Sequence, residues 1–277
     1  MSSPTHTLTQ RLANPTRFLA LTAWLLPLFS IAATLTSAVG LYMAFFVAPT
    51  DYQQGDTVRI MFIHVPAAWL AMMGYAIVAL SSFGLIVFRH PLADVSAKAA
   101  APIGAAFTAL ALVTGSLWGK PMWGTYWVWD ARLTSVLILF FLYLGLIALR
   151  SSLEDEALAG KLTAILAIVG VVILPFIKIS VEGLNIPWLG INIPSWNTLH
   201  QPSSVLRSDG PKIHSSILIP LLVNAAGFSL LFFAMHLKAM KNEILRRRLA
   251  ALTRAAIERA EREGARGRTA ATRVTTA

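Results

Sequence analysis

The sequence contains no cysteine, and charged residues make up only 13% of its 277 positions. Without thiols, the chain cannot form disulfide bonds, thiolate metal sites or thiol redox centres, so any metal ligand must come from histidine, carboxylate or methionine. With 56% hydrophobic residues and a mean hydropathy of +0.65, the chain is too apolar for a soluble domain of this length. The composition therefore predicts an all-α integral membrane protein.

Several enzyme signatures are also missing. The sequence has no glycine-rich phosphate loop, no HExxH zinc motif and no GxSxG nucleophile motif. Charged residues are nearly absent from the interiors of the apolar segments, which argues against a proton-coupled pump with buried ionisable relays.

Six apolar segments meet or approach the roughly 20 residues that a membrane-spanning helix needs. The first is too long for a signal-peptide core and is interpreted as a signal anchor. We expect residues 1–240 to form a six-span membrane domain and residues 241–277 a basic C-terminal tail. The predicted spans are Phe18 to Ala48, Met61 to Phe88, Pro102 to Leu117, Leu133 to Leu149, Leu162 to Lys178 and Ile213 to Leu237.

The net charge of +10 comes largely from the end of the chain, where residues 238–277 carry eleven of the 23 Lys and Arg. Because cytoplasmic loops are enriched in these residues, we expect both termini to be cytoplasmic. The tail is predicted to be a charged helix that contacts anionic lipid headgroups. Nucleic-acid binding is the weaker alternative, since no suitable fold or aromatic reader accompanies the charge.

Four of the eight tryptophans lie in the thirteen residues 118–130, between the third and fourth predicted spans. Gly119, Pro121 and Gly124 are expected to break a helix here, so the rings should lie on a loop or broken surface helix and form a flat platform. On the predicted topology seven of the eight tryptophans gather on the outer side. An ordinary aromatic belt would populate both membrane interfaces, so the asymmetry favours a platform for a planar, apolar cofactor over a belt.

Two histidines accompany these aromatic residues on the outer side. His64 begins the second span, and His200 lies four residues after Trp196. Neutral imidazole is a common axial ligand of haem iron, and two histidines from separate elements could hold one iron from opposite faces. The alternative is that each is a polar interfacial residue without a ligand. His214 is a reserve ligand, and the basic residues that could meet the porphyrin carboxylates are Arg59, Lys120, Arg132 and Arg207.

Two acidic residues flank these groups. Asp130 directly precedes the fourth span, where an aspartate commonly caps a helix by accepting backbone N–H bonds. Glu182 follows the fifth span and is expected to be an exposed carboxylate, with hydrogen bonding to a ligating imidazole as the alternative.

Residues 118–134, with the sequence WGKPMWGTYWVWDARLT, resemble the tryptophan-rich WWD signature of haem-handling proteins in cytochrome c biogenesis. Flanking words are similar to the haem exporter protein C family within that group, and the likeness extends over roughly residues 12–240. These words are Asp51–Gly55 (DYQQG), His64–Ala68 (HVPAA), Ala101–Gly104 (APIG) and Trp196–Gln201 (WNTLHQ).

The resemblance implies a six-helix protein of the bacterial inner membrane with the WWD loop in the periplasm. Such proteins bind haem b non-covalently and in transit, with axial histidines that match His64 and His200. They present it to the haem chaperone CcmE, alongside the ATP-driven pair CcmA and CcmB and the small subunit CcmD, and act as transfer components rather than enzymes. Besides the two histidines, the expected haem-contacting residues are Trp118, Trp123, Tyr126, Trp127, Trp129, Asp130 and Arg132.

The sequence departs from the family pattern at two places. Tyr126 stands where the family often has tryptophan, and residues 183–194 form an apparent insertion before Trp196. Two other functions stay open at this stage. A small-molecule permease would use the outer aromatic pocket as a transport site, and a structural subunit of an ABC transporter would bind no haem.

Overall fold

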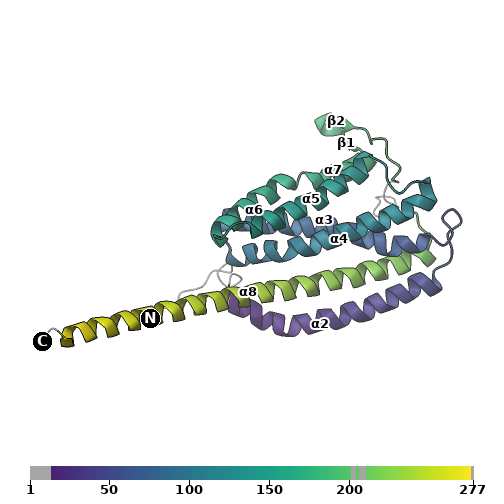
Figure 1. Ribbon diagram of the computed structural model, residues 1–277. Helices are drawn as coiled ribbons and strands as arrows, with labels where there is room; N and C mark the ends of the chain where they lie inside the picture. The colour runs from purple at the N-terminus through teal and green to yellow at the C-terminus, as the bar shows by residue number, and fades with distance from the viewer. Residues whose placement is uncertain (1–13, 201–203, 206–209, 276–277) are drawn as a thin grey trace, which may run out of the picture.

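The computed structural model describes residues 14–200, 204–205 and 210–275, with side chains of the last helix described to residue 263. Most of this chain is helical, and six helical segments of the described residues are long and apolar enough to cross a membrane (Figure 1). The predicted all-α membrane fold is therefore confirmed. The helices are α2 (Pro15–Tyr42) with the π-helical turn η1 (Met43–Val47), α3 (Val58–Phe88), α4 (Pro91–Trp123), α5 (Ala131–Ser151), α6 (Glu156–Gly170), α7 (Ile173–Glu182) and α8 (Ser215–Thr275).

The order of the helices gives the bundle two distinct ends. The connections 48–57, 124–130 and 183–214 lie at one end, which we call the site end. The connections 89–90 and 152–155 lie at the other, where α8 continues out of the bundle as a long arm; we call it the arm end (Figure 1). The predicted outer-side histidines that the structure describes, and the aromatic loop, therefore belong to the same end of the molecule.

Helix α4 is longer than the sequence predicted at both of its ends. It begins at Pro91 rather than near Pro102, and it runs through Gly119 and Pro121 to Trp123. The prediction that these two residues break the helix was wrong, because a proline so near the C-terminus removes only a hydrogen bond to the carbonyl one turn earlier. The helix ends at Gly124, whose φ of 76° lies in the left-handed region that glycine adopts without strain.

The main core lies between α3, α4 and α5 and is organised around two buried tyrosines. The rings of Tyr75 and Tyr143 meet edge to face at 5.2 Å, and the Tyr143 hydroxyl donates to the Ala71 carbonyl at 2.8 Å. Gly104 of α4 makes room for this arrangement, because a Cβ there would lie 2.1 Å from the Tyr143 hydroxyl oxygen. The close approach of α4 to α3 and α5 therefore depends on a residue without a side chain.

Helix α2 packs mainly on α8, and this pair forms its own layer of the bundle (Figure 1). The contact uses small residues: Gly40 faces Asn224, whose Nδ2 donates to the Gly40 carbonyl at 2.8 Å, and Gly227 faces Ser37. Such close crossings are typical of membrane helices, where van der Waals packing and polar contacts replace the hydrophobic effect.

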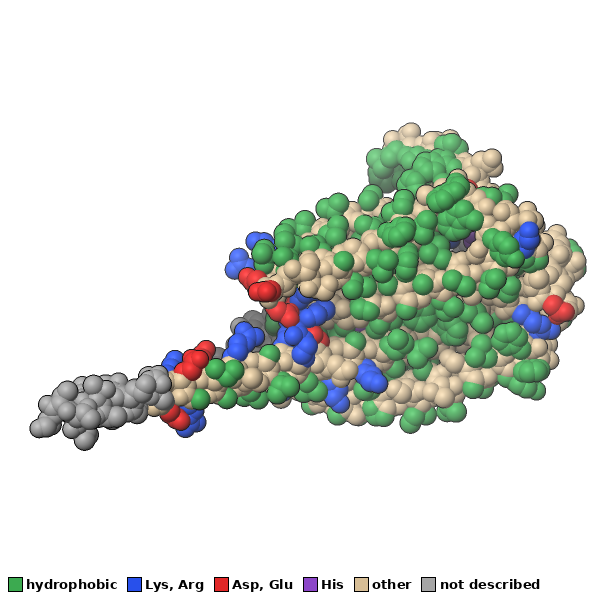
Figure 2. All heavy atoms as spheres, viewed as in Figure 1, with side chains coloured by type: hydrophobic (Ala, Val, Ile, Leu, Met, Phe, Trp, Pro, Cys, Tyr) green, Lys and Arg blue, Asp and Glu red, His purple; other side chains and the backbone are tan. Residues whose placement is uncertain are grey.

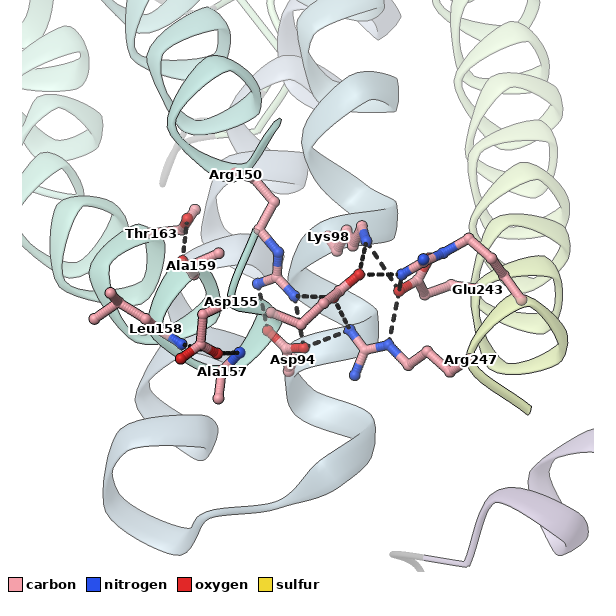
Figure 3. Close-up of polar contacts among 12 residues, drawn as sticks. Asp94, Lys98, Arg150, Asp155, Ala157, Leu158, Ala159, Thr163, Glu243 and Arg247 are labelled. Carbon is pink, nitrogen blue, oxygen red and sulfur yellow. Dashed lines mark hydrogen bonds and ion pairs between the residues drawn. The ribbon is translucent and has the colours of Figure 1, made fainter. Parts of the chain in front are cut away.

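The face of the bundle drawn in Figure 2 is largely apolar, whereas acidic and basic side chains gather where α8 leaves the bundle. Figure 3 shows the centre of this group, in which Asp94 of α4 accepts from Arg150 of α5 at 2.5 and 2.8 Å and from Arg247 of α8 at 2.5 Å. Glu243 accepts from Lys98 and Arg247, and Glu156 forms an ion pair with Arg246. We call the seven residues the arm-end cluster: Asp94, Lys98, Arg150, Glu156, Glu243, Arg246 and Arg247.

Helix α8 crosses the predicted boundary between the membrane domain and the tail without a break. Its turns at Glu243 and Arg247 belong to the arm-end cluster, and the arm proper begins after them. The tail is therefore helical, as predicted, and is a direct continuation of the last span.

The apparent insertion at residues 183–194 forms a small antiparallel hairpin of β1 (Leu184–Ile186) and β2 (Ile191–Ile193), joined by the 3-10 turn η2 (Pro187–Leu189). Figure 1 shows it rising beside α7, on the side away from α2 and α8. Trp188 at its tip is 82% exposed. The insertion thus forms an outgrowth of its own at the end of α7.

Candidate functional site

His64 lies near the start of α3, and its ring contacts α4. Its Nδ1 lies 3.0 Å from the Ala111 carbonyl oxygen and 3.1 Å from Thr114 Oγ1. A carbonyl oxygen only accepts, and the Thr114 hydroxyl already donates to the Leu110 carbonyl at 2.6 Å, so Nδ1 must carry the proton. In the neutral ring this leaves the lone pair on Nε2, for which the described residues provide no hydrogen bond. This is the arrangement that metal-ligating histidines use.

Two residues of α4, Gly115 and Trp118, lie against the imidazole of His64. A Cβ at Gly115 would lie 2.8 Å from His64 Cε1, so only glycine lets the imidazole lie this close to the helix. One turn later the indole of Trp118 meets the imidazole edge to face at 5.6 Å, and its Nε1 donates to Gln54 Oε1 at 3.1 Å. The position of His64 is therefore set by two α4 turns and by the connection before α3.

The aromatic loop, residues 124–130, returns across the end of α4. Ser116 Oγ donates to the Tyr126 carbonyl at 2.8 Å, and Lys120 Nζ lies 5.3 Å from the centre of the Tyr126 ring. The Trp127 and Trp129 rings meet at 5.6 Å with an interplanar angle of 78°. The predicted flat platform is therefore absent, because Trp118 lies partly buried on a helix and these two rings are nearly perpendicular.

The tryptophans of this region differ in exposure. Trp129 is 77% exposed, and Trp123 and Tyr126 are also exposed, whereas Trp127 is partly buried. The indole Nε1 of Trp127 is buried, and no hydrogen-bond partner for it lies among the residues that the structure describes. A buried donor without a partner is costly, so this N–H is suited to meet an acceptor on a ligand.

Asp130 joins the aromatic loop to the segment that carries His200. Its Oδ1 accepts from the Leu133 N–H at 2.8 Å and caps α5, as the sequence predicted. Its Oδ2 accepts from the Thr198 hydroxyl at 2.5 Å and from the Leu199 N–H at 3.2 Å. The His200 N–H donates to Thr198 Oγ1 at 3.1 Å.

His200 lies close enough to His64 for their charges to interact, although 136 positions separate them in the sequence. The segment before it is anchored on α7, where the Trp196 N–H donates to the Ser180 carbonyl at 3.0 Å and the Trp196 ring meets Phe176 at 4.9 Å. Both predicted iron ligands therefore lie at the same end of the bundle.

The predicted basic residues have separate surroundings. Arg132 Nη1 donates to the Ile177 carbonyl of α7 at 2.7 Å, and its charge also interacts with those of Asp130, Glu182 and His64. Arg59 donates to the Ala44 and Phe45 carbonyls and pairs with Asp56, and Lys120 donates to the Gly124 carbonyl. Arg207 lies outside the described residues. Among the predicted basic residues that the structure describes, Arg132 is thus the one whose charge interacts with that of a predicted ligand.

The remaining histidines belong to other surroundings. His214 Nδ1 contacts the hydroxyl and the N–H of Ser216 at the start of α8. His236 is buried on α8, where its Nε2 contacts Ser96 Oγ at 3.2 Å and its ring stacks on Phe232. Glu182 pairs with Lys178 at 2.8 Å rather than with an imidazole.

Sequence reasoning missed the residues that hold the two histidines: Gln54, Thr114, Gly115 and Thr198. Gln54 and Thr198 lie in two of the family words quoted above, but nothing in those words indicates a contact with a histidine, and Thr114 and Gly115 lie in none of them. The role of each depends on a contact that the sequence alone does not show. The spacing of Thr114 and Trp118, one helical turn apart on α4, is the one signal that could have placed both on the face toward His64.

The side chains at the site end fit the chemistry of a haem. A haem needs nitrogen ligands for iron, apolar surfaces for the porphyrin faces, and cations or N–H donors for its two propionates. His64 Nε2 supplies a ligand with a fixed tautomer, the indoles supply apolar surface, and Trp127 Nε1 and Arg132 supply a donor and a cation.

Comparison with known proteins agrees with the family resemblance seen in the sequence. The family profile described as heme exporter protein C matches residues 8–255. The heme exporter protein C of Bradyrhizobium diazoefficiens is 59% identical over 241 residues, covering 87% of each chain, and that of Escherichia coli K12 is 46% identical over 235 residues, covering 85% of this chain and 90% of the relative. A mitochondrial protein of Marchantia polymorpha, described as ccmC-like in cytochrome c biosynthesis, is 47% identical over 192 residues, covering 69% and 76%.

Proposed function

The chain belongs to the haem exporter protein C family, a group of membrane proteins in haem export for cytochrome c biogenesis, and we propose that it holds haem b at the site end through His64 and His200. On this proposal the protein lies in the bacterial inner membrane with the site end in the periplasm and both termini in the cytoplasm. It binds and hands over haem and has no catalytic turnover of its own.

The observation that carries the proposal is the state of His64. Its Nδ1 is committed to the Ala111 carbonyl and Thr114, so its Nε2 is presented as a ligand, and His200 lies within electrostatic reach of the same ring. An ordinary interfacial histidine has no need of a helix shaped around it, as α4 is at Gly115. Iron ligation explains both features.

The other side chains at the site end then have separate tasks. Trp118, Trp127 and Trp129, with Trp123 and Tyr126, cover the faces and edge of the porphyrin. Trp127 Nε1 and the Arg132 guanidinium meet its propionates. Two imidazoles fill both axial positions of the iron, which leaves no position for oxygen and suits a protein that carries haem rather than using it.

Release follows from how the two ligands are held. His64 lies on a helix and its Nδ1 is bound to α4, whereas His200 lies on the connection between α7 and α8. We propose that the haem chaperone CcmE receives the haem at the exposed side of the site, near Trp129, and that His200 is the ligand that leaves. CcmA, CcmB and CcmD complete the delivery system, and the arm of α8 contacts anionic lipid headgroups at its base.

The test is the haem content of the purified full-length chain and of three variants: His64→Gly, His200→Gly and, as a matched control, His214→Gly. His214 lies at the same end but contacts Ser216 of its own helix start. We expect the parent and the control to retain haem, and each of the first two variants to lose most of it and regain it when imidazole is added. A parent without haem would favour a structural subunit, and full haem in both ligand variants would contradict this site.

A further inference from the structure

The structure assigns to Asp130 a role beyond its cap: we propose that its carboxylate is the latch that holds His200 in its ligating position and joins it to the aromatic loop. The inference rests on the proposed function, since it takes His200 as an iron ligand. It names the group that positions this ligand and a bond whose opening frees it. Asp130 is a positioning residue in this account.

The first step is the division of labour between the two carboxylate oxygens. Oδ1 accepts from the Leu133 N–H and satisfies one of the free donors at the start of α5. Oδ2 turns to the other side and accepts from both the Thr198 hydroxyl and the Leu199 N–H. A cap needs one of these oxygens, so the second pair of bonds serves the His200 segment, residues 195–200.

The second step is the short path from this carboxylate to the ligand. Thr198 Oγ1 donates to Asp130 and at the same time accepts from the His200 N–H at 3.1 Å. The backbone of His200 is therefore linked to Asp130 through one hydroxyl. Hydrogen bonds to an ionised carboxylate are about twice as strong as neutral ones, so this link is the strong part of the chain.

The third step concerns what else holds the segment. Its other described attachment is at Trp196, on α7, four residues before the ligand. Between these two points the Thr198 hydroxyl and the Leu199 N–H donate to Asp130, and the His200 N–H donates to Thr198 Oγ1. Loss of the Oδ2 bonds would therefore loosen Thr198 and Leu199 next to the ligand, while the α7 attachment and the α5 cap stay in place.

The fourth step is the position of Asp130 in the aromatic loop. It follows Trp129 directly and ends the loop, so the same side chain ties the exposed indole to the His200 segment. A movement of the loop is then transmitted to His200 through Oδ2. A partner that displaces the loop would weaken the His200 ligand without touching it.

The experiment measures hydrogen exchange of the haem-free, full-length chain in detergent, for the parent, Asp130→Asn and Thr198→Val. Asparagine keeps an oxygen for the Leu133 N–H but presents an amide group to the Thr198 and Leu199 donors, and valine removes the Thr198 hydroxyl and leaves the cap untouched. We expect amides 197–200 to exchange about tenfold faster in each variant, since about 1.4 kcal/mol corresponds to a factor of ten.

Asp155→Asn is the matched control. Asp155 caps α6 through the Ala157 and Leu158 N–H groups in the same way, but it lies at the arm end and, among the described residues, its carboxylate accepts from no second segment (Figure 3). We expect this control to leave amides 197–200 unchanged. Unchanged exchange there in both test variants would overturn the latch, as would an equal effect in the control.

The same variants loaded with haem give a second measurement. Asp130→Asn and Thr198→Val are expected to lose the low-spin spectrum that two imidazoles produce, and added imidazole is expected to restore it, as for a missing His200. A spectrum identical to that of the parent would overturn the latch. If the parent takes up no haem, the proposed function fails, while the exchange comparison still decides whether Asp130 holds the segment.

Discussion

At the scale of single residues, the site depends on side chains whose identity is dictated by a neighbour. His64 presents Nε2 because Ala111 and Thr114 occupy Nδ1, and it fits against α4 because position 115 has no side chain. The sequence was enough to single out His64 as a candidate ligand, since a histidine at the outer end of a span beside tryptophans suggests haem. Its supporting residues could not, because they act through contacts between α3 and α4.

Gly115→Ala tests this dependence directly. A Cβ at 2.8 Å from His64 Cε1 must displace the imidazole or the helix, so we expect the variant to lose most of its bound haem. Gly145→Ala is the control, because a Cβ on this α5 glycine meets nothing within 4 Å. It should keep its haem and gain up to about 1 kcal/mol of helix stability. Normal haem content in Gly115→Ala, measured by its visible spectrum, would show that the close approach is not required.

At the scale of elements, charge-charge contacts fix the arm to the bundle. Asp94 and Arg150 have side chains only 12% and 9% exposed, and the arm-end cluster connects α4, α5, α6 and α8. The sequence predicted a charged tail but could not predict this cluster, because its members are up to 153 positions apart. The pattern of apolar residues along the sequence predicts the helices, whereas the contact between Asp94 and Arg247 depends on how α4 and α8 pack together.

Asp94→Asn is expected to destabilise the bundle by roughly 3 kcal/mol, because it leaves the nearly buried Arg150 guanidinium without its main partner and removes one of the two carboxylates that pair closely with Arg247. Unfolding in mixed detergent and SDS micelles measures this change. The control is Glu263→Gln, which breaks an exposed pair with Arg259 and should change stability by less than about 0.5 kcal/mol. Equal effects of the two substitutions would mean that the cluster adds no more than a surface ion pair.

The hairpin at residues 184–193 is the element that the sequence left most open, since an insertion so near His200 could have altered its approach. Its strands pair with each other, and Gly183, with φ 69°, lets the chain begin the turn against the Ile193 carbonyl. The segment that follows is attached separately, through Trp196 and Thr198. The ligand segment therefore has attachments of its own outside the hairpin.

A variant in which two glycines replace residues 185–192 should retain haem and the parent spectrum, because the attachments to Ser180 and Asp130 lie outside the deletion. Loss of haem in this variant, with unchanged expression and helix content, would show that the hairpin supports His200. Trp188→Phe, at the exposed tip, provides the mildest form of the same test.

At the scale of the whole molecule, the six spans could be predicted because each is a run of apolar residues about as long as a membrane is thick. The ends of the spans could not be predicted. Helix α4, for example, begins eleven residues before its predicted start. The end of the bundle at which each side chain lies was also predictable, since the order of the spans alone places His64, the aromatic loop and His200 at the same end. The perpendicular rings and the latch at Asp130 depend on distances between segments, which periodicity does not contain.

The predicted orientation can be measured because the chain has no cysteine, so a single introduced thiol reports one position. Gln53→Cys lies at the site end and Leu252→Cys on the exposed arm. A membrane-impermeant maleimide added to cells with a permeabilised outer membrane should label the first, and the second only after lysis. The reverse pattern would place the arm outside and contradict the orientation derived from its positive charge.

The account depends on one iron held between His64 and His200. Electron paramagnetic resonance of the ferric, haem-loaded chain tests this most directly, because the signal of low-spin iron reports its two axial ligands. We predict the signal of two imidazoles in the parent and in His214→Gly, and its loss in both His64→Gly and His200→Gly. A high-spin signal in the parent, or a low-spin signal that survives either of the latter substitutions, would contradict the account.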